Sequence, residues 1–162
     1  MWVPYRIPAT FTVTNANGDV DLLLIRPATN KPVRLAGWII SQTSEVGDAQ
    51  EENLRITVRH MAATLTVTGG TTVSAPPPNH PGVDPAASGT YTVNHATVTT
   101  TSGTSTIMEE MGWNERNTPW ERWIPEELRP NAINGDGLLV RQESTVADDV
   151  VYTVTFFVEE LI

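Results

Sequence analysis

Histidine, a common metal ligand and general base, occurs three times in this chain, at His60, His80 and His95. These spacings match no zinc-binding pattern, and no HExxH motif is present. Cysteine is absent, which excludes thiolate metal sites, a cysteine nucleophile and disulfide bonds together. No serine lies in a Gly-x-Ser-x-Gly elbow, and there is no glycine-rich phosphate loop. We therefore predict a protein without a cofactor, a metal centre or enzymatic activity.

Paired carboxylates could still act as general acid and base, since most glycosidases use two of them. The pairs in this chain, Glu109–Glu110, Glu126–Glu127 and Glu159–Glu160, are adjacent in the sequence. On a strand, adjacent side chains point to opposite faces, so the two members of a pair cannot meet. A glycosidase pair assembled from separate strands is still open, but nothing in the sequence selects one.

The connector from Ser41 to Asn53 is a third place where chemistry could occur. It holds four acids within residues 45–52 and no basic residue. Carboxylates at this density could bind calcium, but their spacing does not match an EF-hand loop. We favour a solvated acidic loop, because runs of like charge usually face water. Asp48 followed by Glu51 fits an N-cap with its N3 carboxylate, which predicts one helical turn.

Three of the five tryptophans lie close together in the sequence, at Trp113, Trp120 and Trp123. Large aromatic side chains of this kind can close the end of a β core or bind a sugar, and we favour the plug. The segment that begins at Thr118 has proline at the first helical position and glutamate three residues after the threonine. This pattern predicts a short helical turn, which Pro125 ends.

The composition indicates a single domain that does not bind nucleic acid. The chain has 162 residues, of which 40% are hydrophobic, so we predict a single domain over residues 1–162. The formal net charge of -9 repels phosphate, and we expect no direct contact with DNA or RNA. The longest aliphatic run, residues 22–25, is too short to cross a membrane. The N-terminus lacks the apolar core of a signal peptide, so we expect a soluble protein with no membrane partner.

Alternation of polar and apolar residues predicts an all-β fold, an antiparallel β-sandwich of jelly-roll type. The β-patterned runs cover residues 10–14, 19–26, 33–40, 54–59, 63–68, 90–99, 105–113, 138–142 and 150–158. The run 33–40 is apolar at both parities, so we expect a strand that is covered on both faces. In the last run, Tyr152, Val154 and Phe156 share one parity, which predicts a central strand with these side chains buried.

Two segments are rich in proline and lack this periodicity. Residues 1–8 hold two prolines and two aromatics, and residues 73–89 hold five prolines. Proline removes backbone donors and stiffens the chain, so we expect an N-terminal arm and a long loop that pair poorly within the sheets. The arm, with Trp2 and Tyr5, packs either on its own body or on a neighbouring subunit. Stiff segments lose less entropy on docking, which makes these two the candidate interaction sites. The candidate residues are Trp2, Tyr5, Pro76, Pro77, Pro78, Pro81 and Pro85.

The stretch from residue 37 to residue 55 reads GWIISQTSEVGDAQEENLR. It resembles a family of small proteins encoded by tailed bacteriophages and prophages, whose members share this strand, acidic loop and following strand. They also share a middle rich in Pro, Gly and Ala, and a last strand that ends in VEEL, here residues 158–161. The resemblance runs from about Val20 to the end of the chain, and its specific part is the loop.

The resemblance implies a structural protein of the virion, assembled in the cytoplasm of the host. We expect a capsid decoration or cement protein that stabilises the head by binding the major capsid protein or other virion proteins. An acidic protein suits a position outside the DNA-filled shell. We also expect a homo-oligomer, a trimer, because capsids offer threefold sites. A tail, neck or fibre-base protein is the alternative within the virion, and a carbohydrate-binding β-sandwich module is the alternative from another class.

Overall fold

Antiparallel strands make up nearly all of the regular structure in the computed structural model, which describes residues 1–44, 53–76, 85–117 and 119–162. The strands are β1 Trp2–Val13, β2 Val20–Arg26, β3 Val33–Gln42, β4 Asn53–Met61, β5 Leu65–Thr68, β6 Thr71–Val73, β7 Thr90–His95, β8 Thr97–Thr101, β9 Ser105–Asn114, β10 Trp120–Trp123, β11 Asn131–Ala132, β12 Gly137–Gln142 and β13 Val150–Leu161. Within these residues the helical structure is one 3-10 turn, η1 Glu126–Leu128. The predicted all-β class is confirmed.

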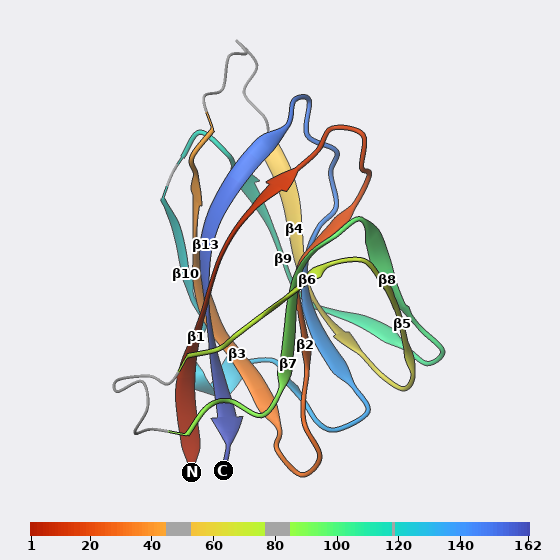
Figure 1. Cartoon of the computed structure of the whole chain (residues 1–162), viewed down its shortest axis with the longest axis vertical. Helices are drawn as coiled ribbons and strands as arrows, with labels where there is room; N and C mark the ends of the chain where they lie inside the picture. The colour runs from red at the N-terminus through yellow and green to blue at the C-terminus, as the bar shows by residue number, and fades with distance from the viewer. Residues whose placement is uncertain (45–52, 77–84, 118) are drawn as a thin grey trace.

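The strands form two sheets that face each other as a sandwich (Figure 1). Sheet A has the order β1-β13-β3-β10, and β11 also pairs with β3. Sheet B has the order β6-β7-β2-β12-β4-β9. Consecutive strands lie in opposite sheets at β1 and β2, at β3 and β4, at β9 and β10, and at β12 and β13. The chain therefore crosses repeatedly from one sheet to the other around one core.

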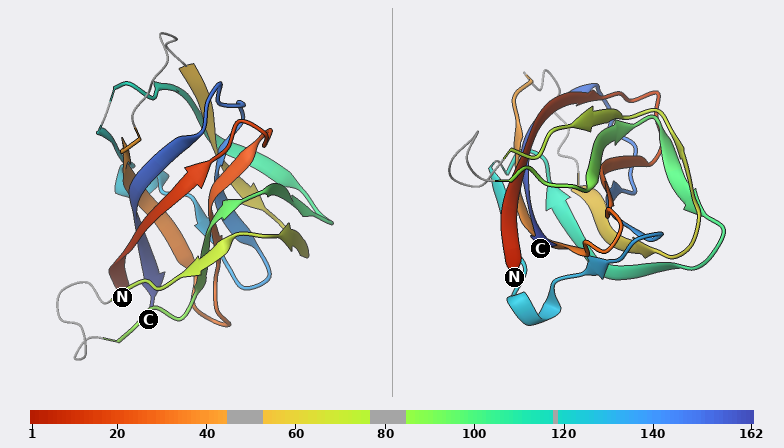
Figure 2. Two further views of the ribbon diagram at one scale, coloured as in Figure 1. Left: turned by 45° about the horizontal axis from the view of Figure 1, so that its top comes forward. Right: turned by 60° about the horizontal axis from the view of Figure 1, so that its bottom comes forward.

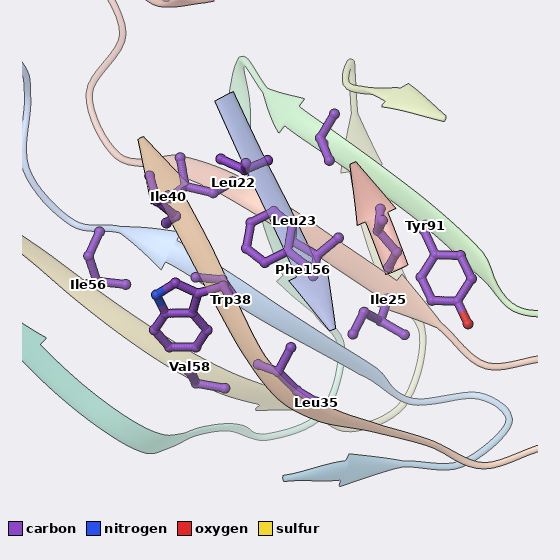
Figure 3. Packing of buried hydrophobic residues seen from close by; sticks show 14 of the residues in the cluster. Leu22, Leu23, Ile25, Leu35, Trp38, Ile40, Ile56, Val58, Tyr91 and Phe156 are labelled. Atoms are coloured by element: carbon purple, nitrogen blue, oxygen red, sulfur yellow. The ribbon is translucent and has the colours of Figure 1, made fainter. Parts of the chain in front are cut away.

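β13 is a central strand, as its alternating pattern predicted. It pairs with β1 over twelve residues on one side and with β3 on the other. Tyr152, Val154 and Phe156 are all buried. Phe156 lies opposite Trp38 in register, and both point into the core between the sheets (Figure 3). Fully burying a side chain of this size contributes about 1.5–3 kcal/mol, so β13 anchors sheet A to the core.

The ends of the described chain meet at one end of sheet A (Figure 2). The Met1 amino group donates a hydrogen bond to the carbonyl of Ile162 at 2.8 Å. This contact extends the β1–β13 ladder, in which Trp2 is paired with Leu161. The first and last strands of the chain are therefore neighbours.

A two-stranded ribbon of β5 and β8 lies against the outer side of sheet B (Figure 1). Leu65 and Val67 of β5 pack on Leu24, Met61 and Leu139. β2 is consequently buried on both faces, which accounts for its unbroken apolar run. Sheet A has no such ribbon among the described residues.

A buried ion pair fastens this ribbon to sheet B. Arg141 of β12 donates a hydrogen bond from Nε to Asp21 of β2 at 2.6 Å, and the Asp21 side chain is wholly buried. Thr99 of β8 joins both partners, because its backbone N–H donates to Asp21 Oδ2 at 2.6 Å. The Thr99 carbonyl accepts from Arg141 Nη2 at 2.8 Å. Both backbone groups of one ribbon residue are thus held by a charged pair.

The structure corrects the expectation of an extended N-terminal arm. Residues 2–13 form β1, which pairs with β13 along its whole length. Pro4 and Pro8 are compatible with a strand here because β1 lies at the edge of sheet A, where one row of N–H groups needs no ladder partner. The two prolines therefore mark an edge strand and not an unpaired arm.

The helical turn predicted from Thr118 to Pro125 is also wrong. Residues 120–123 form β10, paired with residues 37–40 of β3, and the helical turn η1 begins only after Pro125. Between two prolines the segment is too short to gain from helix formation, whereas the edge of sheet A offers it a ladder. Thr118 lies outside the described residues, as do residues 45–52 with their predicted helical turn and calcium site.

The expectation that β3 is covered on both faces is wrong as well. Arg34 and Ile39 are only partly buried on the outer side, whereas Leu35, Trp38 and Ile40 are buried in the core. The run does not alternate in sequence because it contains a β-bulge. Before the bulge the odd-numbered residues point into the core, and after it the even-numbered residues do.

Candidate functional site on the outer face of sheet A

One row of residues crosses all four strands on the outer face of sheet A. Arg6 of β1 lies opposite Phe157 of β13, Phe157 opposite Gly37 of β3, and Gly37 opposite Trp123 of β10. The residues on either side of Arg6 and of Phe157 are buried in the core. Because side chains alternate along a strand, Arg6 and Phe157 point outward. The row brings together residues that are far apart in the sequence.

A β-bulge at Gly37 in β3 allows β10 to join this row of residues. The register shifts between Phe157 and Val158, so Ala36 and Gly37 of β3 together face Phe157. A Cβ atom at Gly37 would lie 2.2 Å from the carbonyl oxygen of Arg122. Only glycine therefore lets β10 approach this closely, and this approach brings Trp123 beside Phe157.

Trp123 and Phe157 form an aromatic pair on this face. Their ring centroids are 4.5 Å apart with an interplanar angle of 35°. The Trp123 side chain is 52% exposed, although it is large and apolar. The pair borders a pocket of about 270 Å³ that also contacts Pro4, Arg6 and Glu159. An exposed tryptophan at the rim of a pocket is a typical anchor for a partner molecule.

Glu159 organises the arginines next to the pocket. Arg129 donates from Nη1 to both of its carboxylate oxygens, at 2.8 and 2.9 Å, and Arg34 donates from Nε. Arg34 also contacts Glu126 at 2.9 Å. Burial opposes the charge of Arg34, but its hydrogen bonds to the two glutamates outweigh this and raise its pKa. The guanidinium lies 4.4 Å from the ring centroid of Trp2, a cation–π contact that holds this tryptophan on the face.

Arg6 differs from the other two arginines of this face. It is exposed, and among the described residues it has no carboxylate within salt-bridge distance. Its register partner in β13 is Phe157. The pocket lining thus holds two arginines, Arg6 and Arg129, but only the single carboxylate of Glu159. In a chain with a net charge of -9, this pocket is locally cationic.

The structure separates the two aromatics that were predicted as interaction residues. Trp2 is partly buried and lies at the end of this face, over Arg34. Tyr5 is buried, because its place in β1 turns it toward the core. Its hydroxyl donates to the carbonyl of Pro85 at 3.3 Å. Tyr5 is therefore a structural residue and Trp2 is the one that the outer face presents.

Part of the proline-rich segment is tied to the sandwich, contrary to expectation. The backbone N–H groups of Ser88 and Gly89 donate to the buried carboxylate of Glu160 at 2.8 and 3.0 Å. Lys31 donates to the Ser88 hydroxyl at 2.8 Å. Pro76 is half-buried and Pro85 is exposed. The candidates Pro77, Pro78 and Pro81 lie outside the described residues.

Two of the three clustered tryptophans plug the core, as predicted. Trp113 stacks on Trp120 with centroids 5.2 Å apart, and Trp120 packs edge-on against Trp38 at 5.3 Å. Trp113 is 4% exposed. Trp123 lies three residues after Trp120 in β10, so its side chain points to the opposite face and away from the core. The cluster therefore divides between the core and the candidate site.

The remaining titratable residues that the sequence singled out serve the fold. His60 pairs with Asp136 at 3.2 Å, and His95 is buried against the Thr92 hydroxyl at 2.8 Å. Across the described ranges no group of three metal-ligating side chains comes together, and His80 lies outside those ranges. Glu159 and Glu160 point to opposite faces, as adjacent strand residues should.

A comparison with protein-family models, curated proteins and solved structures finds no match. Among the described residues, no helix has the length and apolar character needed to span a membrane. Sequence reasoning missed Arg6, Phe157 and Glu159, because only strand register brings them together.

Proposed function

We propose that this protein is a non-enzymatic structural component of a tailed-phage virion, a decoration protein that binds and stabilises the capsid. The observation that carries the proposal is the outer face of sheet A, with its exposed aromatic pair and locally cationic pocket. Tryptophan and arginine are the residues most enriched at protein-binding hot spots. The partner is the major capsid protein or another virion protein, and the protein is located in the virion.

The order of the strands supports a jelly roll. The four strands β1-β13-β3-β10 lie against β2-β12-β4-β9, and β5 to β8 form an insertion between β4 and β9. Each half of the chain alternates between the sheets, as two interlocked Greek keys do. Jelly rolls occur in viral capsid domains and in lectins, although a fold alone does not determine a function.

The mode of attachment differs from the arm-and-loop clasp that the sequence suggested. β1 is part of sheet A and is not free to act as an arm, so the flat face of the sheet takes over the role of contact surface. We propose a homo-oligomer, a trimer, in which several such faces engage one particle and add avidity. Light scattering coupled to size-exclusion chromatography measures this state directly.

The test is binding of the purified protein to capsids that lack it, with occupancy and position read from a cryo-EM map. Trp123→Ala should weaken binding by roughly thirty-fold, the effect of losing a hot-spot anchor worth about 2 kcal/mol. Ile133→Ala is the matched control, because Ile133 is 57% exposed but lies outside sheet A. Density at the tail or neck would replace the head assignment, and no density on particles would refute the proposal.

A carbohydrate-binding module is the second candidate function. It is favoured by the half-exposed Trp123 beside Phe157 in a pocket near the size of one sugar ring. A glycan array separates the two candidates. Binding to a glycan that Trp123→Ala abolishes, without any binding to particles, would select the carbohydrate function.

A further inference from the structure

Among the described residues, the edge of sheet B formed by β9 has no further strand beside it. In the part of the chain that the structure describes, β9 pairs only with β4, so the backbone groups on its other side have no partner strand. At the edge of sheet A, Pro4 and Pro8 of β1 hinder the addition of another strand. β9 has ten residues and no proline. Among the described residues it is the longest edge strand without proline, although a register shift leaves Met108 as a bulge in it.

Two hollows lie along this edge. The larger, of about 530 Å³, separates β9 from the segment around η1 and is lined by Met108 and Leu128, which are 50% and 65% exposed. The smaller, of about 400 Å³, is lined by Glu109 and Trp120 among others. Arg122 and Glu109 form a contact of 3.1 Å that links β10 to β9. The larger hollow thus offers the apolar side chains of Met108 and Leu128 beside charged residues such as Glu127, and the smaller hollow is charged.

Glu109 offers a carboxylate oxygen that lacks a partner. Its Oε1 accepts a hydrogen bond from Arg122, whereas its Oε2 is buried and has no hydrogen-bond partner. Leaving a buried charged oxygen unpaired is unfavourable, and a hydrogen bond from a cationic group is the strongest way to satisfy it. The edge therefore favours an incoming segment that carries a lysine or arginine.

We propose that β9 binds an extended segment of a partner protein by strand addition, with a basic residue of that segment paired to Glu109. Apolar side chains of the segment fill the hollow beside Met108 and Leu128. Main-chain hydrogen bonds supply affinity in this mode, and pockets for alternate side chains supply specificity. A second copy of β9 does not fit, because antiparallel self-pairing would place the acids Glu109 and Glu110 of the two copies close together. This surface is separate from the outer face of sheet A.

The probe is a nine-residue peptide of alternating threonine and valine with lysine at the fifth position. Two control peptides carry norleucine in place of lysine, or N-methyl groups on alternate backbone amides. Affinity is measured by calorimetry, and the binding site is mapped by hydrogen exchange of the whole protein. We expect the lysine peptide to bind and to protect amides within residues 105–114. The N-methylated peptide should not bind, because it cannot form the ladder.

Glu109→Gln tests the charged contact. It should weaken the lysine peptide by about tenfold, the effect of losing one charge-assisted hydrogen bond, and leave the norleucine peptide unchanged. Glu121→Gln, an exposed residue of β10, changes the net charge equally and should have no such effect. If Glu109→Gln does not fold, the difference between the lysine and norleucine peptides on the unaltered protein decides. No binding, equal affinity of the two peptides, or protection outside β9 would overturn the proposal.

Discussion

Removing the charge of Asp21 should release the β5–β8 ribbon from sheet B. Asp21→Asn keeps the shape of the side chain, so the change isolates the ion pair with Arg141. In the substituted protein Arg141, whose side chain is 10% exposed, would keep its charge without a buried counter-charge. Breaking a buried pair by removing one partner costs about 3–5 kcal/mol. The bond from the Thr99 N–H to Asp21 Oδ2 would also be weakened, since a neutral amide is a poorer acceptor than a carboxylate.

The double substitution provides the quantitative test. Arg141→Met alone should cost a similar amount, because it leaves the wholly buried Asp21 carboxylate unpaired. With both changes no charge is left uncompensated, so the double variant should be more stable than the sum of the single costs predicts, by about 2–3 kcal/mol. Urea unfolding gives the free energies. Hydrogen exchange shows whether the amides of residues 97–101 open before the rest of sheet B.

An exposed ion pair serves as the control. Arg55 and Glu110 contact each other at 2.5 Å with side chains 46% and 51% exposed. Glu110→Gln should leave the urea midpoint nearly unchanged, because water screens this pair. If the costs of Asp21→Asn and Arg141→Met add to that of the double variant within about 0.5 kcal/mol, the two residues do not act as a unit. In that case other contacts, and not this ion pair, hold the β5–β8 ribbon on sheet B.

Three further outcomes are expected. Phe156→Ala should cost about 3–5 kcal/mol in urea unfolding, and a loss below about 1 kcal/mol would contradict a central β13. Gly37→Ala should displace β10 and change the near-UV circular dichroism of its tryptophans; an unchanged spectrum would show that the Cβ is accommodated. Burial lowers the pKa of His95, so the folded protein keeps this ring neutral while the unfolded chain takes up a proton. Stability should therefore fall as the pH drops from about 7 to about 5, and His95→Gln should flatten this slope in unfolding titrations.

The β class and the central position of β13 follow from the sequence because alternation is a local signal. Tyr152, Val154 and Phe156 alternate with the polar residues Thr153 and Thr155, and one buried face is sufficient to produce that pattern. The first part of β1 and the whole of β10 were missed for a physical reason. Pro4 and Pro8 are unfavourable in an isolated strand and are acceptable in β1 because it lies at the edge of sheet A, whereas the prolines that flank β10 at residues 119 and 125 suggested a helical turn.

The candidate site could not be predicted from spacing. Arg6, Phe157 and Trp123 become neighbours through three separate strand registers, and each register depends on the packing of the whole sandwich. The bulge at Gly37 then determines which parity of β3 faces outward. The tryptophan cluster was visible in the sequence. Which face of β10 each side chain occupies was not, and this face determines that Trp120 packs in the core whereas Trp123 is exposed.

The pairing of β1 with β13 also determines when the protein can fold during its synthesis. Sheet A joins β1 to β13, so it cannot be completed while residues 150–161 are still missing. Synthesis of the intervening chain takes on the order of ten seconds. Sheet B is also incomplete until β12, at residues 137–142, joins β2 to β4. Until then the apolar side chains of both sheets are open to other nascent chains. High expression rates and elevated temperature should therefore lower the soluble yield more strongly than the stability of the finished sandwich alone would suggest.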